Sequence, residues 1–352
     1  MANHKPRQAN YELLRIIAML MIITLHYLDK GGILPKLKGE LTTSGYMAWG
    51  LEALCIVSVN VYVLISGYFG VESTSFYPKK IGKIWGQVFF YSVTIAIISI
   101  SLGIVPLSAL NIYVIAGYIF PIITEHYWFA TSYVLLFLFM PFLNAGIKQI
   151  NKKQFQFVLL MLIGLLSISK TIIPMTLPID NMYHVVWFIC LYFMGAYLNI
   201  YGLRMLQNKI ICLVIYLGSS TGILITALLI RKIYRTTGKL EGLLGYSYHY
   251  NHILCLLGAI GLFGLFGHLV LKEGKVVEII VKVASCTFGV YLIHEHSSIR
   301  NLWPTWFQTE KYADTPFFLL HWIVTVCSVF IICTFIEYVR SVIYDRLTNK
   351  MD

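Results

Sequence analysis

The sequence predicts an all-α polytopic integral membrane protein, with about 10 transmembrane helices in one bundle. Two observations carry this prediction. Of the 352 residues, 58% are hydrophobic and only 12% are charged, whereas soluble domains carry about 25% charged residues. Long apolar runs also recur along the whole chain, separated by short polar, Gly or Pro breaks. No internal repeat or appended soluble region is visible, so we expect residues 1–352 to form a single transmembrane domain.

Each predicted span is close to the length of about 20 apolar residues that crosses a bilayer as a helix. A shorter apolar piece, Ala109 to Ile123, is predicted to be an interfacial or re-entrant segment. The first run contains Arg15 and His26 and lacks a small-residue cleavage site, so we interpret it as a spanning helix rather than a signal peptide. The ten spans cover residues 11–29, 47–70, 82–104, 127–145, 155–173, 183–200, 209–230, 251–271, 283–300 and 316–343.

The distribution of Lys and Arg predicts the orientation. With ten spans, the N- and C-termini lie on one side together with sixteen Lys and Arg residues, whereas ten lie on the opposite side. The positive-inside rule then places both termini in the cytoplasm of a multi-pass protein of the cell membrane. One cluster, from Arg231 to Lys239, works against this orientation.

Charge and cysteine content exclude other classes of protein. In a soluble protein the net charge of +11 would suggest nucleic acid as a partner, but basic cytosolic loops explain it, so no nucleic acid is expected. The seven cysteines all fall inside apolar runs without metal-ligand spacing. They are expected to be small core residues, and no metal is expected.

The first predicted helix carries an unusual number of ionisable residues. Arg15 and His26 are eleven residues apart, so at about 100° per residue they share one face, roughly 16 Å apart along it. Glu12 lies three residues before Arg15, and Asp29 lies three residues after His26, so each pair can interact. Ionisable groups at membrane depth are costly unless they face a protein interior.

Two interpretations of this polar stripe remain open. A neutral His beside a carboxylate commonly acts as a general base. Asp29 is the residue expected to orient the His26 imidazole. Alternatively, Arg15 extends to the cytosolic interface and His26 lies at the level of the outer headgroups.

The next segments suggest close helix packing and a cationic patch. Ser66 and Gly67 would let helix backbones approach closely inside the bundle. Lys80 and Lys83, with Lys79 beside them, lie at the cytosolic start of the third span. They are either positive-inside anchors or an anion site suited to the phosphates of a cytosolic cofactor.

Two further clusters lie at the predicted outer ends of spans. Glu125 and His126 precede Tyr127 and Trp128. The aromatic belt at a membrane interface explains the two aromatic residues but not the two ionisable ones. The second cluster, at the end of the ninth span, is too dense for chance anchoring, and it contains His294, Glu295, His296 and Arg300.

Together these segments resemble the membrane-bound acyltransferase-3 family, whose members acylate extracytoplasmic sugars and related acceptors. The LIHEH…IR…LW segment is similar to the Gram-positive branch of the family, of the surface-polysaccharide O-acetyltransferase type. Most relatives have Arg at the basic pair, and Lys keeps the charge without the bidentate grip of Arg. The matching positions are Glu12, Arg15 and His26, then Tyr62 to Tyr68, Lys80 and Lys83, His126 to Phe129, and Tyr291 to His294.

The resemblance implies a membrane O-acyltransferase. An acyl-CoA, usually acetyl-CoA, would enter from the cytosol, and its acyl group would pass to a hydroxyl of a cell-surface glycan or lipid-linked sugar outside. Either the chain acylates this acceptor directly or a separate extracytoplasmic protein completes the transfer. The resemblance and the spacing together assign catalysis to His26, Arg15, Asp29 and Glu12, donor binding to Lys80, Lys83, Ser66 and Gly67, and acceptor binding to His126, Trp128, His294 and Glu295.

Two alternatives come from other classes of protein. One is a transporter or flippase for a small molecule or lipid-linked sugar built on the same fold, although the paired repeats typical of transporters are not visible. The other is a membrane subunit without chemistry, whose buried polar groups serve packing.

Overall fold

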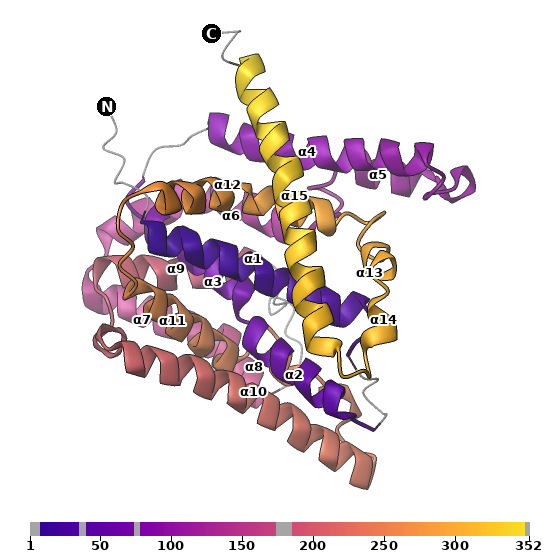
Figure 1. Cartoon of the computed structure of the whole chain (residues 1–352). Helices are drawn as coiled ribbons and strands as arrows, with labels where there is room; N and C mark the ends of the chain where they lie inside the picture. The colour runs from indigo at the N-terminus through magenta and orange to yellow at the C-terminus, as the bar shows by residue number, and fades with distance from the viewer. Residues whose placement is uncertain (1–7, 35–39, 74–77, 174–184, 349–352) are drawn as a thin grey trace.

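The computed structural model describes residues 8–34, 40–73, 78–173 and 185–348, and every regular element within these ranges is helical (Figure 1). Nine helices or helix pairs in this part are long and apolar enough to cross a membrane, and Val185–Ile200 is a shorter apolar helix. These ten correspond to the ten predicted spans, which confirms the prediction of an all-α polytopic membrane protein. The sixth span was predicted from residue 183, which lies outside the described residues.

The first half of the chain contributes most of the helices around the core. In this half, α2 and α3 together form one interrupted span, and α7, the π-helical η2 and α8 form another. The elements are α1 (Ala9–Lys30), α2 (Thr43–Cys55), α3 (Ser58–Gly70), α4 (Pro78–Ser101), η1 (Leu107–Ala109), α5 (Ile112–Ile119), α6 (Trp128–Gln149), α7 (Lys152–Ile163), η2 (Gly164–Ile168), α8 (Ser169–Ile172) and α9 (Val185–Ile200).

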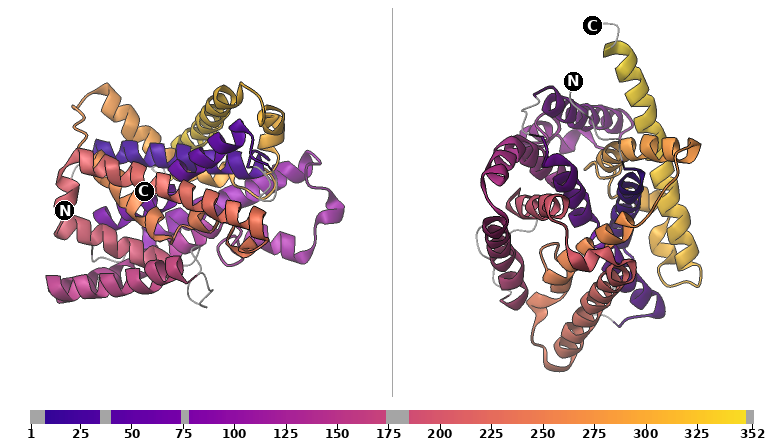
Figure 2. Two further views of the ribbon diagram at one scale, coloured as in Figure 1. Left: turned by 90° about the horizontal axis from the view of Figure 1, so that it is seen from below. Right: turned by 90° about the vertical axis from the view of Figure 1, so that its left-hand side faces the viewer.

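The second half alternates long helices with short ones in the connections. The 31-residue α15 extends beyond the rest of the bundle at its C-terminal end (Figures 1 and 2). The elements are η3 (Arg204–Gln207), α10 (Lys209–Thr237), η4 (Glu241–Leu243), η5 (Tyr246–Tyr248), α11 (Ile253–Gly267), α12 (Lys275–His294), α13 (Trp303–Trp306), α14 (Thr309–Tyr312) and α15 (Phe318–Thr348).

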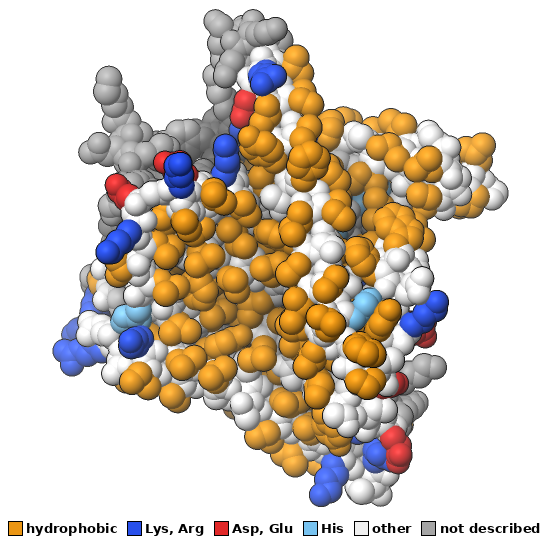
Figure 3. Space-filling model, in the orientation of Figure 1, with side chains coloured by type: hydrophobic (Ala, Val, Ile, Leu, Met, Phe, Trp, Pro, Cys, Tyr) orange, Lys and Arg blue, Asp and Glu red, His pale blue; other side chains and the backbone are white. Residues whose placement is uncertain are grey.

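Helices at the centre and at the periphery differ in what surrounds them. Two thirds of the apolar window of α1 is buried, whereas α10 and α15 bury only 22% and 28% of theirs. On the face that contains α15, hydrophobic side chains cover the middle and Lys and Arg lie toward the edges (Figure 3). A helix that exposes apolar side chains over most of its surface suits contact with lipid.

The crossing of α3 and α9 depends on two glycines. A Cβ atom on Gly67 would overlap the carbonyl oxygen of Tyr192, and one on Gly195 would overlap that of Leu64. Only Gly therefore fits at these two positions, and the predicted close backbone approach at Ser66 and Gly67 is confirmed. The predicted short segment after α4 also appears as a short helix, the eight-residue α5, whose first amides donate to the Asn111 side chain.

Contacts between helix ends define two ends of the bundle. At one end α1 and α12 finish and α6 and α15 begin, and there the Tyr27 hydroxyl lies 2.9 Å from His321 Nδ1. At the opposite end α1 begins, and the Asn10 amide donates to the carbonyl of Phe266 at 3.0 Å. We call these the His26 end and the Arg15 end. Which of them faces the cytoplasm stays a prediction from the charge count.

Candidate active site at the His26 end

The last turns of α1 and α12 bring two histidines together. His26 Nδ1 lies 2.9 Å from His294 Nε2, and His294 Nδ1 lies 2.6 Å from the carbonyl oxygen of Val290. A carbonyl can only accept, so His294 Nδ1 carries a hydrogen and Nε2 of the neutral ring is an acceptor. His26 Nδ1 must then donate to it, which leaves the lone pair of His26 Nε2 available to take a proton.

Glu295 is the carboxylate of this cluster. Its Oε2 lies 3.2 Å from His26 Nδ1, and both carboxylate oxygens bind the ammonium group of Lys30. Arg300 lies 3.6 Å from Oε1. Glu295 is buried, and a buried carboxylate is tolerated when it is paired in this way. A carboxylate beside the donating nitrogen orients the ring and would stabilise its protonated form.

Asp29 was predicted to orient His26, but the structure places a different carboxylate beside the His26 imidazole. Asp29 is exposed, whereas Glu295, the residue that caps the C-terminus of α12, occupies the position beside His26 Nδ1. His26 and Lys30 are four residues apart and share the face of α1 that packs against α12, because four residues span about 400°. Asp29, three residues after His26, lies about 60° from that face and interacts electrostatically with Glu52 of α2.

Glu12 and Arg15 form the ion pair that their spacing predicts, with 3.8 Å between Arg15 Nη1 and Glu12 Oε2. Glu12 is buried, and 29% of the Arg15 side chain is exposed. The helical rise separates Arg15 from His26 by roughly 16 Å, so this pair does not join the His26 cluster.

A small aromatic cavity adjoins His26. Trp128 stacks on Tyr250 in its wall, with 5.7 Å between ring centroids, and Phe129 and Phe288 complete that side. The cavity has a volume of about 20 Å³, which is close to the space that one water molecule needs. Trp128 was predicted to bind the acceptor, and the structure brings it into the same cavity as the imidazole.

Tyr291 also lines this cavity. Its side chain is only 3% exposed, and no described residue forms a hydrogen bond with its hydroxyl group. The backbone amide of Phe129 comes near the hydroxyl oxygen but lies outside hydrogen-bond geometry. A buried hydroxyl without a partner costs free energy, so an oxygen atom of a ligand would be a favourable acceptor at this position.

His126 lies in a neighbouring cluster rather than in the His26 cavity. Its Nε2 lies 3.1 Å from the Ser297 hydroxyl, and its ring contacts those of Tyr118 and His296. Burial and, to a smaller extent, the nearby charge of Arg300 lower the pKa of His126 to about 4, so the ring is neutral near pH 7. Arg300 therefore links this cluster to Glu295, which Arg300 also contacts.

The residues predicted to bind the donor are not assembled into one site. Ser66 Oγ lies 3.1 Å from the Tyr62 carbonyl and 2.9 Å from the Tyr133 hydroxyl, so it serves the α3 packing together with Gly67. Lys83 is exposed at the Arg15 end, 4.0 Å from Asp345. The side chain of Lys80 lies outside what the structure describes.

Two residues of the His26 end, Lys30 and Tyr250, are not among the site residues that the sequence predicts, and the sequence assigns no role to the Tyr291 hydroxyl, although Tyr291 begins the matching segment Tyr291 to His294. Lys30 was counted as a loop cation, although its spacing of four residues from His26 signals a shared face. Nothing in the sequence links Tyr250 to His26, because they lie on distant segments. Within the described ranges, no group of three or more His, Cys, Asp or Glu residues has the arrangement of a metal site.

The comparisons with known proteins give one match. The model of a protein family described as an acyltransferase domain matches residues 8–338. This range contains α1 to α14 and most of α15, and therefore every residue of the His26 cluster. No curated protein and no solved structure matches the chain.

Proposed function

The chain belongs to the acyltransferase-3 family and is a membrane acyltransferase, and on this premise we propose that it transfers an acetyl group from acetyl-CoA to a hydroxyl of a cell-surface glycan or lipid-linked sugar. The observation that carries the proposal is the hydrogen-bond network of His26, His294 and Glu295, which leaves His26 Nε2 as a base beside a cavity. The protein would act in the cell membrane with both termini in the cytoplasm.

In the proposed reaction, His26 Nε2 accepts the proton of the acceptor hydroxyl while the hydroxyl oxygen attacks the thioester carbonyl carbon. The new C–O bond forms, the C–S bond breaks, and the leaving sulfur takes the proton back from His26. Glu295 and His294 are positioning residues, since they act through the imidazole. Glu295 also stabilises the positive charge that His26 carries between the two proton transfers.

Tyr291 is the proposed donor to the oxyanion. Negative charge develops on the thioester oxygen as the hydroxyl attacks, and a fixed donor in a water-poor site stabilises it strongly. The Tyr291 hydroxyl lacks a partner among the described residues and lines the same cavity as His26. These are the properties expected of a group that forms its hydrogen bond only with the substrate.

The size of the cavity supports a short acyl group. At about 20 Å³ it must widen even for an acetyl group, and the half-buried pair Trp128 and Tyr250 is the wall best able to move. We propose that the donor extends from the Arg15 end, with Arg15, Lys80 and Lys83 toward its phosphates. The product would leave directly or through a separate extracytoplasmic protein.

The experiment compares His26→Ala and Arg15→Ala with His268→Ala, which removes an exposed imidazole at the Arg15 end. Labelled acetyl-CoA consumption and the ester content of surface glycans are measured in membranes with matched protein levels. We expect His26→Ala to lose roughly 10²- to 10⁴-fold in rate, the range for loss of a general base. Unchanged glycan acetylation in both His26→Ala and Arg15→Ala would contradict the proposed site.

A further inference from the structure

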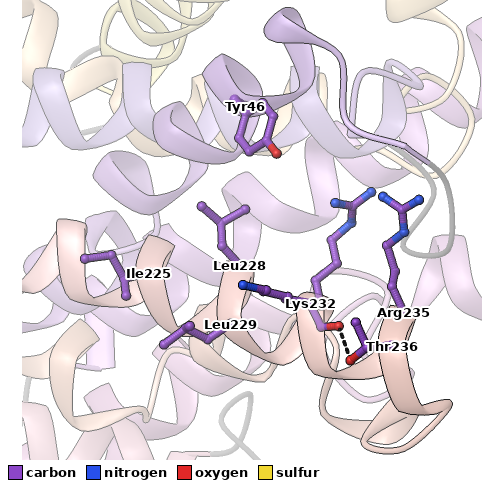
Figure 4. A pocket seen from close by; sticks show the side chains of 8 residues that line it. Tyr46, Ile225, Leu228, Leu229, Lys232, Arg235 and Thr236 are labelled. Carbon is purple, nitrogen blue, oxygen red and sulfur yellow. Dashed lines mark hydrogen bonds between the residues drawn. The ribbon is translucent and has the colours of Figure 1, made fainter.

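A second cavity, much larger and cationic, lies between the start of α2 and the last turns of α10 (Figure 4). Its volume is about 600 Å³. Arg231, Lys232 and Arg235 line it from α10, and Tyr46 faces them from α2. The cavity is at the His26 end, because α2 follows the last turn of α1 and Arg235 pairs with Glu40 in the connection between them.

The positive charge of this groove is concentrated on one helix face. Arg231 and Arg235 are four residues apart and therefore neighbours on α10. Arg235 Nη2 lies 3.0 Å from Glu40 Oε1, and Arg231 interacts electrostatically with both of these residues. Among the described residues, Arg231, Lys232 and Arg235 line the groove, and Glu40 is the carboxylate that pairs with Arg235. An anion between the two guanidinium groups would relieve their mutual repulsion.

The remaining wall of the groove is apolar and open to lipid. Ile225 precedes Arg231 and Leu229 precedes Arg235 by about 1.7 helical turns along α10. Half or more of each apolar side chain is exposed, at 50% and 55%. Leu228 completes this wall. A ligand that fills the groove would therefore be anionic at the end of α10 and hydrocarbon toward the middle of the helix.

Membrane anchoring alone does not account for these cations. The charge count from the sequence makes the Arg15 end the cytoplasmic one, so the positive-inside rule favours Lys and Arg there and not at the His26 end. An anchoring Arg also extends its guanidinium group into water, whereas Arg231 is buried, with 5% of its surface exposed.

We propose that the groove binds one anionic lipid, with its phosphate between Arg231 and Arg235 and its hydrocarbon chains along Ile225 and Leu229. The planar guanidinium group matches phosphate oxygens bidentately, which suits Arg better than Lys for this position. The lipid would lie at the same end of the bundle as the His26 cluster. This binding does not depend on acyl transfer, so it is tested separately from the proposed function.

The experiment uses the full-length protein in detergent and phosphatidic acid as the probe, with bound lipid counted by native mass spectrometry. Two variants are compared with the wild type: Arg231→Gln/Arg235→Gln, and Lys232→Gln/Arg235→Gln, which changes only exposed side chains. The matched control, Lys209→Gln/Lys239→Gln, removes the same charge from outside the groove. We expect both groove variants to bind phosphatidic acid at least about tenfold more weakly, because charge-assisted hydrogen bonds are lost, and the control to bind it as the wild type does.

Three outcomes would overturn the proposal. The first is equal retention of phosphatidic acid by the wild type and by the Lys232→Gln/Arg235→Gln variant, whose changes lie outside the core. The second is an equal loss in the control, which would indicate attraction to net charge. The third is displacement of the lipid by inorganic phosphate at equal concentration, which would indicate a site for a free anion instead of a lipid.

Discussion

The two ends of α1 hold their ionisable side chains in different ways. At the Arg15 end, Glu12 and Arg15 pair with each other inside one helical turn, and Arg15 remains partly exposed. At the His26 end, His26 and Lys30 are paired with His294 and Glu295, which lie 268 and 265 residues away in the sequence. The Glu12–Arg15 pair is local and can form within α1 alone. The His26 and Lys30 pairs form only when α1 and α12 are packed correctly.

The largest contrast is expected from removing one carboxylate at each end. Glu295→Gln would leave Lys30 and Arg300 beside the imidazole without a counter-charge, so acyl transfer should fall roughly 10³-fold through loss of the oriented, stabilised base. The free energy of unfolding should fall by about 3 kcal/mol, since a buried ion pair is broken.

Glu12→Gln should change the free energy of unfolding by about 1 kcal/mol or less. Transfer rates and thermal unfolding of the two purified variants test the contrast, and equal effects would contradict it.

A smaller effect is expected from Tyr291→Phe, which sharpens the description of the His26 end. The change removes only the hydroxyl group that lacks a partner, so kcat should fall about 10²-fold while KM for the donor stays close to the wild-type value. Stability should be unchanged or slightly higher, because no hydrogen bond is lost.

The control for this prediction is Tyr216→Phe, whose hydroxyl donates to the Leu54 carbonyl at 3.0 Å and lies away from the cavity. Tyr216→Phe should lower thermal stability and leave kcat unchanged. If Tyr291→Phe behaves like this control, then Tyr291 is a packing residue and the oxyanion donor is another group.

The smallest effect is expected at the Arg15 end. Neutralising Lys80 and Lys83 to Gln should raise KM for acetyl-CoA a few-fold with little change in kcat, because exposed cations contribute uniform binding of modest strength. Lys148→Gln/Lys153→Gln removes the same charge from exposed positions at this end and should leave KM unchanged. An equal KM in both double variants would indicate that Lys80 and Lys83 are topology anchors only.

Features that depend on residues close together in the sequence could be predicted from it. The spans, the Glu12–Arg15 pair and the glycine at the α3–α9 crossing all follow from apolar length, helical spacing and residue size. The polar stripe also made His26 a candidate site residue, and Trp128 and His294 could be predicted as site residues, but the place where the three meet could not. Apolar length, helical spacing and residue size are sufficient for these features.

The partner of His26 could not be predicted in this way. Spacing favoured Asp29, but the face that α1 presents to α12 is decided by packing between distant helices, and that packing selects Glu295 and Lys30. The same limit applies to Tyr250, which reaches the His26 cavity from the segment before α11. The groups predicted to hold the donor phosphates stay a prediction, since Lys83 is exposed and Ser66 is engaged within the bundle.

The separation between α1 and α12 along the chain has a consequence for biosynthesis. His294 lies 268 residues after His26 along the chain, so α1 is synthesised well before α12. Until α12 inserts and docks against α1, the imidazole has neither its tautomer-setting partner nor its carboxylate. The chain should therefore be unable to transfer an acyl group before α12 has docked against α1.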